Sequence, residues 1–243
     1  MNKKIILSSF ASLLFLSQAA NSEIKVGNLG VITGTVGAAT QYISKGIDSN
    51  RDQATANLTA EFASSTDIQI ILGSGIFYSR PDKPVTSSGA YDYELDYNIG
   101  LRKTIGMATL DIGHLSFTYP SAASNLNLDS SAYYAKAAIA ATKETTFTIY
   151  YEQDDTEGTR ASNRTKLGKR FYELSLSSNL GPVTANLAYG DFDRAVTYTK
   201  VGVAKEITGL NFTADYISNN KDSASYGSAK NNEFIVVGVT KSF

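Results

Sequence analysis

The chain of 243 residues contains no cysteine and no tryptophan, and it has only four prolines and one histidine. Without cysteine there is no disulfide framework, which excludes the small secreted proteins that depend on one. The formal net charge is −1, so the basic excess of a nucleic-acid-binding protein is missing as well. The scarcity of proline, together with 15 tyrosines and 11 phenylalanines, favours β-strands.

Long apolar runs are absent after the N-terminus, and no stretch approaches the roughly 18 apolar residues of a membrane-spanning helix. The N-terminus has lysines at positions 3 and 4, an apolar run from Ile5 to Leu16, and small residues at Ala19 and Ala20. This order is typical of a secretory signal peptide with a cleavage site near residues 19–22. We therefore expect a signal peptide at 1–20, followed by a short segment at 21–32 and a single domain at 33–243.

Apolar and polar residues alternate along most of the remaining chain, as they do in a strand whose two faces meet different surroundings. From Tyr91 to Arg102, every odd position is tyrosine, leucine or isoleucine, and every even position is polar or glycine. The segment from Ala108 to Tyr119 changes phase near His114, which predicts a β-bulge. In total the pattern predicts about twelve strands of roughly ten residues, the length that tilted strands need to cross a membrane.

The predicted strands are 33–44, 53–63, 68–78, 91–102, 108–119, 132–141, 145–152, 170–178, 183–189, 196–205, 210–218 and 233–243. Their connections alternate in length. Short ones lie at 64–67, 103–107, 142–144, 179–182 and 206–209, and longer ones at 45–52, 79–90, 120–131, 153–169, 190–195 and 219–232. Short periplasmic turns and long extracellular loops are typical of a transmembrane barrel. The predicted fold is therefore all-β, a transmembrane antiparallel up-and-down β-barrel. The single barrel domain covers 33–243, and the segment at 21–32 before it is expected to be periplasmic.

The aromatic residues fall at two levels of the predicted strands. Tyrosines lie near the ends that adjoin long loops: Tyr42, Tyr78, Tyr91, Tyr119, Tyr133, Tyr151, Tyr172, Tyr189, Tyr198 and Tyr216. Phenylalanines lie nearer the short turns: Phe62, Phe147, Phe212 and Phe243. This distribution predicts two interfacial girdles. As a terminal aromatic that closes an alternating strand, Phe243 resembles the signal that the outer-membrane assembly machinery reads.

If the apolar face of each strand meets lipid, the polar face lines the interior. The predicted lumen-lining residues are Glu61, Asp92, Glu94, Asp96, Asn98, Arg102, Lys136, Glu173 and Asp215. Their charges are mixed, so we expect weak ion selectivity. The acidic residues at 92, 94 and 96 could instead perform acid–base chemistry or bind a cation, but a wet wall is the favoured interpretation.

Catalytic and metal sites have little support in the sequence. His114 is the only histidine, and neither a nucleophile motif nor an orienting third group accompanies it. Asp154, Asp155 and Glu157 precede a run of basic residues and could form a Ca²⁺ loop or contact lipopolysaccharide, but the EF-hand pattern is missing. A solvated charged loop fits better. We expect no enzyme activity, no cofactor and no metal site.

Several segments of the chain resemble one family. They are Thr33–Val36, Gln41–Ile47, Tyr93–Gly100, Phe117–Pro120 and Val239–Phe243. Together they resemble the TorF-family porin-like proteins, also called the Gcw_chp group, over nearly the whole mature chain. Lys45 stands where that family usually has arginine, which keeps the charge but loses the planar fork of a guanidinium. The resemblance implies an outer-membrane location and a porin role.

The predicted function is a porin-like channel for passive diffusion of ions or small hydrophilic solutes. The alternative is a barrel without transport that acts as a structural or adhesive surface protein. A membrane-embedded hydrolase is disfavoured by the lack of a nucleophile motif, and a soluble secreted β-sandwich by the alternating loops. Expected partners are outer-membrane lipid and lipopolysaccharide, the outer-membrane assembly machinery, and small solutes or ions, with no nucleic acid.

Overall fold

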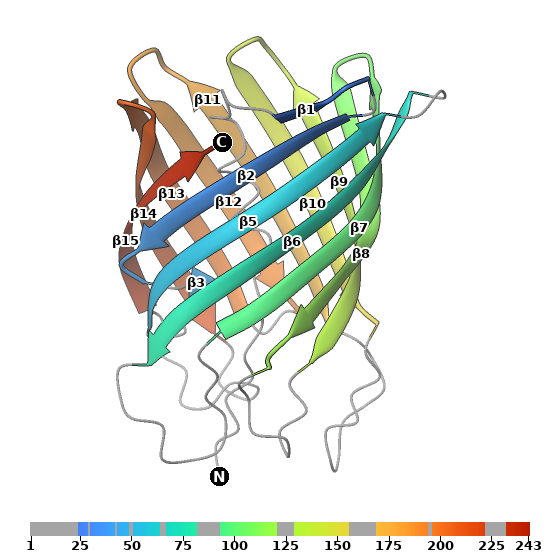
Figure 1. The fold of residues 1–243 in the computed structure, drawn as a ribbon. Helices are drawn as coiled ribbons and strands as arrows, with labels where there is room; N and C mark the ends of the chain where they lie inside the picture. The colour runs from blue at the N-terminus through green and yellow to red at the C-terminus, as the bar shows by residue number, and fades with distance from the viewer. Residues whose placement is uncertain are drawn as a thin grey trace.

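Twelve antiparallel strands join edge to edge in the computed structural model and close on themselves, because β2 pairs with both β5 and β15 (Figure 1). The structure describes residues 24–28, 30–41, 43–48, 51–63, 67–81, 93–120, 129–155, 169–193, 196–221 and 232–243. Within these ranges there is no helix long and apolar enough to cross a membrane. The predicted twelve-stranded antiparallel barrel is confirmed.

The wall of the barrel is made of β2 (Gly30–Ala39), β5 (Arg51–Ala63), β6 (Ile68–Pro81), β7 (Tyr93–Ile105), β8 (Ala108–Thr118), β9 (Ser130–Ala140), β10 (Thr145–Asp154), β11 (Arg170–Asn179), β12 (Thr184–Phe192), β13 (Val196–Ile207), β14 (Leu210–Lys221) and β15 (Asn232–Ser242). Three shorter strands do not belong to the closed wall. β1 (Ile24–Val26) pairs with the start of β2, whereas β3 (Ile43–Ser44) and β4 (Ile47–Asp48) pair with each other.

The two ends of the barrel differ in their connections. Tight turns at the top of Figure 1 define the short-turn end, and most connections at the opposite, long-loop end are longer. One connection departs from the prediction, because β12 continues through Phe192 and only residues 193–195 separate it from β13. The longer loop predicted at 190–195 is therefore wrong.

The strand β8 shows that the interior changes character along the barrel. Its residues pair without interruption with β7 and β9, so the bulge predicted near His114 is wrong. What changes is the polarity of the inward-facing residues. Asp111 is polar, but Leu115 and Phe117, which face the same side, are apolar and each only 2% exposed.

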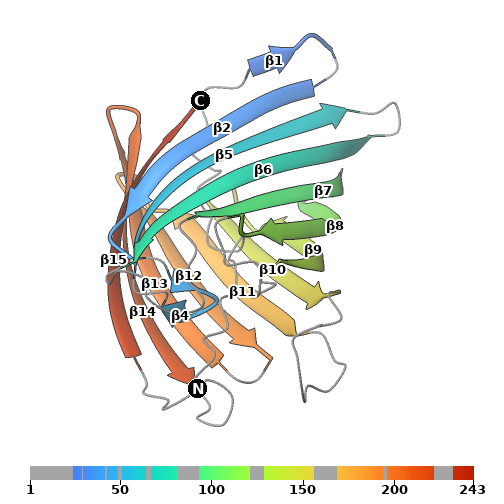
Figure 2. The same cartoon turned by 60° about the horizontal axis from the view of Figure 1, so that its bottom comes forward.

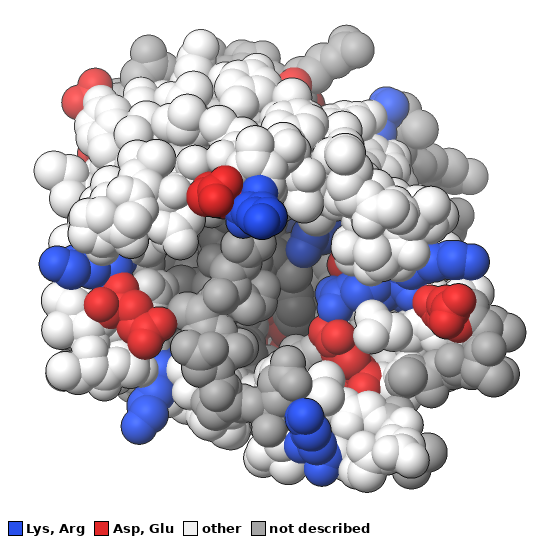
Figure 3. Space-filling view, turned by 90° about the horizontal axis from the view of Figure 1, so that it is seen from above, with Lys and Arg blue, Asp and Glu red and all other residues white. Residues whose placement is uncertain are grey.

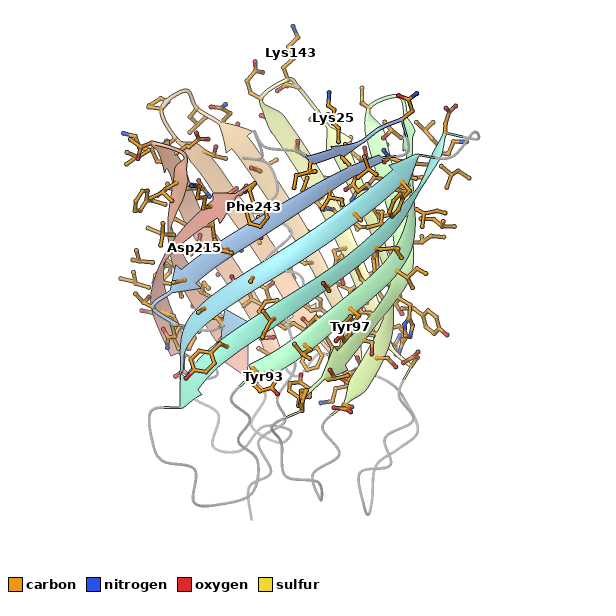
Figure 4. All side chains as sticks on the ribbon, in the orientation of Figure 1. Lys25, Tyr93, Tyr97, Lys143, Asp215 and Phe243 are labelled. Carbon is orange, nitrogen blue, oxygen red and sulfur yellow. The ribbon has the colours of Figure 1, made fainter. Side chains whose placement is uncertain are left out.

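Two tyrosines of the predicted girdle lie inside the barrel. Tyr119 and Tyr198 are 4% and 7% exposed, and both belong to apolar clusters of the interior. Their assignment to the lipid-facing belt is therefore wrong. Other tyrosines of the long-loop half do face outward, among them Tyr133 at 59% exposed and Tyr97, which Figure 4 shows on the outer side of β7. Predicted girdle residues 42 and 91 lie outside the described residues.

The seam between β15 and β2 is the shortest junction of the wall. It includes five residue pairs, from Gly238 with Ala39 to Ser242 with Thr35. Each of the eleven other junctions includes at least nine. After the last pair, Ser242 with Thr35, further backbone hydrogen bonds continue the seam.

Phe243 extends the seam at the short-turn end. Its N–H donates to the Gly34 carbonyl at 2.9 Å, and its carbonyl accepts from the Gly34 N–H at 2.7 Å. The phenyl ring covers Gly34 so closely that a Cβ there would lie 2.5 Å from the ring. Only glycine at position 34 leaves room for the ring, and Phe243 takes part in closing the barrel.

Deleting Phe243 should therefore impair closure even without any cellular assembly machinery. The deletion removes both hydrogen bonds to Gly34 from a five-pair seam. We expect a lower yield of heat-modifiable barrel when the purified protein refolds into lipid vesicles, measured as the fast-migrating band on unheated gels. Phe147→Ala, which removes another outward aromatic on β10, far from the seam, is the matched control. Equal yields for both variants would contradict a role for Phe243 in closure.

Candidate functional site: the interior of the barrel

A small hairpin enters the interior from the long-loop end. The chain leaves the wall at Ala39, and β3 and β4 then lie within the ring of strands (Figure 2). Their two-residue turn consists of Lys45 and Gly46, both left-handed with φ of 49° and 75°. Such turns match the twist of the paired strands. Gly46 lies against the ring of Tyr198, where a Cβ would approach within 2.7 Å, and the Asn219 amide donates a hydrogen bond to its carbonyl.

The side chain of Lys45 is buried at the tip of this hairpin. It is 1% exposed and forms an ion pair with Glu152 on β10, whose side chain is 2% exposed. The Tyr150 hydroxyl donates to the other oxygen of Glu152 at 3.0 Å, which holds this carboxylate in place. The rings of Phe171 and Phe192 lie 5.2 and 5.6 Å from the Lys45 ammonium, within the range of a cation–π interaction.

Further carboxylates interact electrostatically with the Lys45 ammonium. Glu94 and Asp96 on β7 are completely buried, at 0% exposed. Electrostatic interactions link Asp96 to Glu94, Glu152 and Lys45, and they link Asp154 to Lys45 as well. The cation therefore lies among acidic side chains that come from β7 and β10, two strands separated by β8 and β9.

Apolar side chains fill the space around the hairpin. One cluster joins Ile43 of the hairpin to inward-facing residues of the wall, which are Tyr150, Phe171, Phe192, Val196, Tyr198 and Ile217. A second cluster contains Leu115, Phe117, Tyr119 and Ala132. Tyr134 packs against both. The long-loop half of the interior is thus occupied by the hairpin and by aromatic side chains.

The short-turn half of the interior is polar. The Arg102 guanidinium donates to both oxygens of Asp111, at 2.6 and 3.1 Å, and to Glu61 at 2.5 Å. Lys136 is paired directly with Asp111 across β8 and β9. Seen from this end, the molecule is hollowed, with basic and acidic side chains around the hollow (Figure 3).

A second charged group lies on the opposite side of the wall. Electrostatic interactions connect Lys200 on β13 to Glu173 on β11 and to Asp215 on β14. The Tyr198 hydroxyl donates a hydrogen bond to Glu173. Figure 4 places Asp215 on the side of the barrel formed by the last strands. In both groups, acidic side chains lie beside basic ones.

The predicted lumen residues separate into these three groups. Glu61, Arg102 and Lys136 lie together near Asp111. Glu173 and Asp215 interact with Lys200, and Asp96 interacts with Glu94 and with Lys45. Asn98 faces the interior between them, because its neighbours at 97 and 99 face outward. Asp92 lies outside the described residues.

Sequence reasoning missed Lys45, Asp111, Glu152 and Lys200 as members of these groups. For Glu152 a signal existed, because it shares the polar face of its strand with Thr146 and Thr148. Lys45 carries no such signal, because it begins the predicted connection at 45–52. Its position depends on Glu152, which is 107 residues away in the sequence.

His114 lies on the outer face of the barrel near the long-loop end. Its Nε2 contacts Asp155 Oδ2 at 2.8 Å, and the Ser131 hydroxyl donates to the other oxygen of Asp155. Partial burial raises the pKa of Asp155, but these contacts with Ser131 and His114 outweigh it and lower that pKa. A catalytic triad needs histidine between serine and the carboxylate, whereas here the carboxylate lies between them. The arrangement is that of a surface hydrogen-bond network.

Arg102 should be important for stability because two carboxylates depend on it. Replacing it by Gln leaves Glu61 and Asp111 without their shared cation, and lost hydrogen bonds to charged groups cost about 1–3 kcal/mol. We expect Arg102→Gln to lower the free energy of unfolding by this amount, measured by urea titration in lipid vesicles. Lys103→Gln, in the adjacent outward position, is the control and should change little. Equal effects of the two substitutions would rule out this role.

The comparisons with known proteins agree with the barrel. A family model described as "Bacterial protein of unknown function (Gcw_chp)" matches residues 28–243. A chain solved in work on the in-meso crystallization of membrane proteins is similar, with a TM-score of 0.57 and 11% identity over 87% of this chain and 83% of its own length. The COG4313 outer membrane channel from Pseudomonas putida F1 has a TM-score of 0.54 and 13% identity over 92% of this chain and 98% of its own. No curated protein sequence matches. At these identities the structural likeness shows the fold alone.

Proposed function

We propose that this chain, which belongs to the Gcw_chp family of bacterial proteins, is an outer-membrane channel for passive diffusion of ions and small hydrophilic solutes. The observation that carries the proposal is the charged inner wall of the short-turn half, where Arg102 and Lys136 lie beside carboxylates. The molecule is hollowed at this end (Figure 3). Charged side chains on the inner face of a closed barrel are the wall of a water-filled passage. The finer TorF assignment rests on sequence resemblance.

The outer surface supports the membrane location. A closed barrel pairs its backbone groups between strands, which lets it lie in lipid. Most outward residues from Leu95 to Leu101 on β7 and from Leu110 to Ile112 on β8 are apolar and exposed, with Ile99 at 56% and Ile112 at 58%. Lys25 and Lys143 lie at the short-turn rim instead (Figure 4). An apolar outer band with charges at its rim is what a bilayer requires.

The hairpin predicts that conductance is small. Twelve strands enclose more space than eight, and eight are just filled by side chains. In this barrel, however, β3 and β4 with the surrounding aromatic residues occupy the long-loop half. A solute that crosses the barrel has to pass this section, so the hairpin is expected to limit the flow.

Removing the hairpin should therefore raise conductance. Ala39 and Gln53 are directly paired across β2 and β5, so a two-residue Asn-Gly turn can replace residues 40–52. We expect the purified, refolded natural protein to show small single-channel currents in a planar bilayer, and the shortened protein to show severalfold larger ones. A control variant in which the turn residue Lys143 is replaced by Asn should match the natural protein. If neither the natural nor the shortened barrel conducts, the channel is refuted and the structural or adhesive alternative gains support.

The orientation of the barrel can be tested because the chain has no cysteine of its own. Short turns of outer-membrane barrels face the periplasm. We expect a membrane-impermeant maleimide to label Ser225→Cys, in the predicted loop at 219–232, on intact cells. Lys143→Cys, in a short turn, should react only after the outer membrane is permeabilised. The reverse labelling would place the hairpin at the periplasmic end.

A further inference from the structure

The Lys45 ammonium occupies a pocket built by other parts of the chain. We define the ammonium pocket as Glu152, Asp96 and Asp154 together with the rings of Phe171 and Phe192. Glu152 pairs directly with the ammonium, and the Tyr150 hydroxyl fixes that carboxylate from its other oxygen. All of these residues belong to the wall, whereas the cation belongs to a hairpin that lies inside it.

The composition of the pocket suits an organic ammonium ion. Ring faces at 5.2 and 5.6 Å attract a weakly hydrated cation through their quadrupoles, as in the aromatic sites that bind alkylammonium groups. The Glu152 carboxylate in addition accepts an N–H hydrogen bond, which a primary amine can donate. Ca²⁺ needs six to eight oxygen ligands, and aromatic rings offer none. In the part of the chain that the structure describes, no three His, Cys, Asp or Glu residues are placed to hold a metal.

The turn that carries Lys45 does not itself explain a lysine. Its φ of 49° is left-handed, and glycine, asparagine and aspartate are the residues that such turns prefer. Lysine at this position is explained by its ammonium, which reaches Glu152. The side chain thus acts on the pocket as a ligand does, while the Asn219 amide and the contacts of Ile43 hold the hairpin nearby.

We propose that the ammonium pocket is a binding site for primary-amine solutes and that Lys45 is a tethered occupant which such a solute displaces. A tethered group competes at an effective concentration in the millimolar range, so a free amine has to be abundant or to make additional contacts. Primary amines would then be a solute class of the proposed channel. Only their transport rests on the proposed function. Binding to the pocket can be measured without it.

The test replaces Lys45 and supplies the missing cation from solution. Asparagine fits the left-handed turn and lacks the ammonium, so Lys45→Asn leaves the pocket vacant. The variant and the natural protein are refolded with n-propylammonium chloride, with tetramethylammonium chloride or with sodium chloride at equal ionic strength. The readout is the midpoint temperature at which the heat-modifiable form is lost.

We expect n-propylammonium to raise the midpoint of Lys45→Asn in a saturable way, and to leave the natural protein unchanged. Tetramethylammonium should act more weakly, because it has no N–H to donate to Glu152. The double variant Lys45→Asn/Glu152→Gln and the control Lys143→Asn should not respond. A midpoint that is the same in all three salts, or that rises equally in the natural protein, would overturn the proposal.

If Lys45→Asn does not refold, the barrel with residues 40–52 replaced by Asn-Gly provides a second measurement. It lacks Lys45 but keeps every wall residue of the pocket, and isothermal titration with n-propylammonium should give saturable heat that Glu152→Gln abolishes. Absence of binding there would also overturn the site. Binding without any bilayer conductance would support the site and refute the channel. Conductance without binding would support the channel and refute the site.

Discussion

Closure of the backbone is the constraint on which the rest of this structure depends. A strand edge exposed to lipid leaves N–H and C=O groups without partners, so the first and last strands of the wall have to meet. They meet over five residue pairs, with Phe243 and Gly34 adding two hydrogen bonds at one end. At the other end the seam stops because the chain leaves β2 after Ala39 and turns inward. The short seam and the internal hairpin are therefore two results of one event, the early end of β2.

The hairpin divides the interior into two environments with different electrostatics. Around β3 and β4 the space is filled by aromatic side chains, and an isolated charge there would lack the solvation that water provides. Lys45 is consequently held by a partner of opposite charge, Glu152. In the short-turn half, Arg102 and Glu61 are about one-fifth exposed, and water can screen them. One barrel therefore contains a wet section and a dry section in series.

Alternation predicted the strands and the side of the wall that each residue faces, because a period of two is the direct consequence of strand geometry. Alternation failed as a predictor where the inner face of the wall meets apolar side chains and not water. Tyr119 and Tyr198 were assigned to lipid because tyrosine is typical of a girdle, yet both face the dry section. The apparent phase change at His114 has the same origin, since the inward residues become apolar at Leu115 while the strand continues without a bulge. Polarity indicates the face of a strand only when the two faces meet different solvents.

The hairpin could not be predicted from local patterns, because its contacts join Lys45 to a residue 107 positions away and Gly46 to one 173 positions away. Stability alone also does not require the buried ion pair between Lys45 and Glu152. Buried ion pairs can often be replaced by apolar residues without loss of stability. An apolar tip would pack well against Phe171 and Phe192, and it would need no partner on β10. A structural plug alone therefore gives no reason for a charge at position 45. A barrel that admits cations does, because a displaceable ammonium gives the Glu152 carboxylate a partner while no solute is bound.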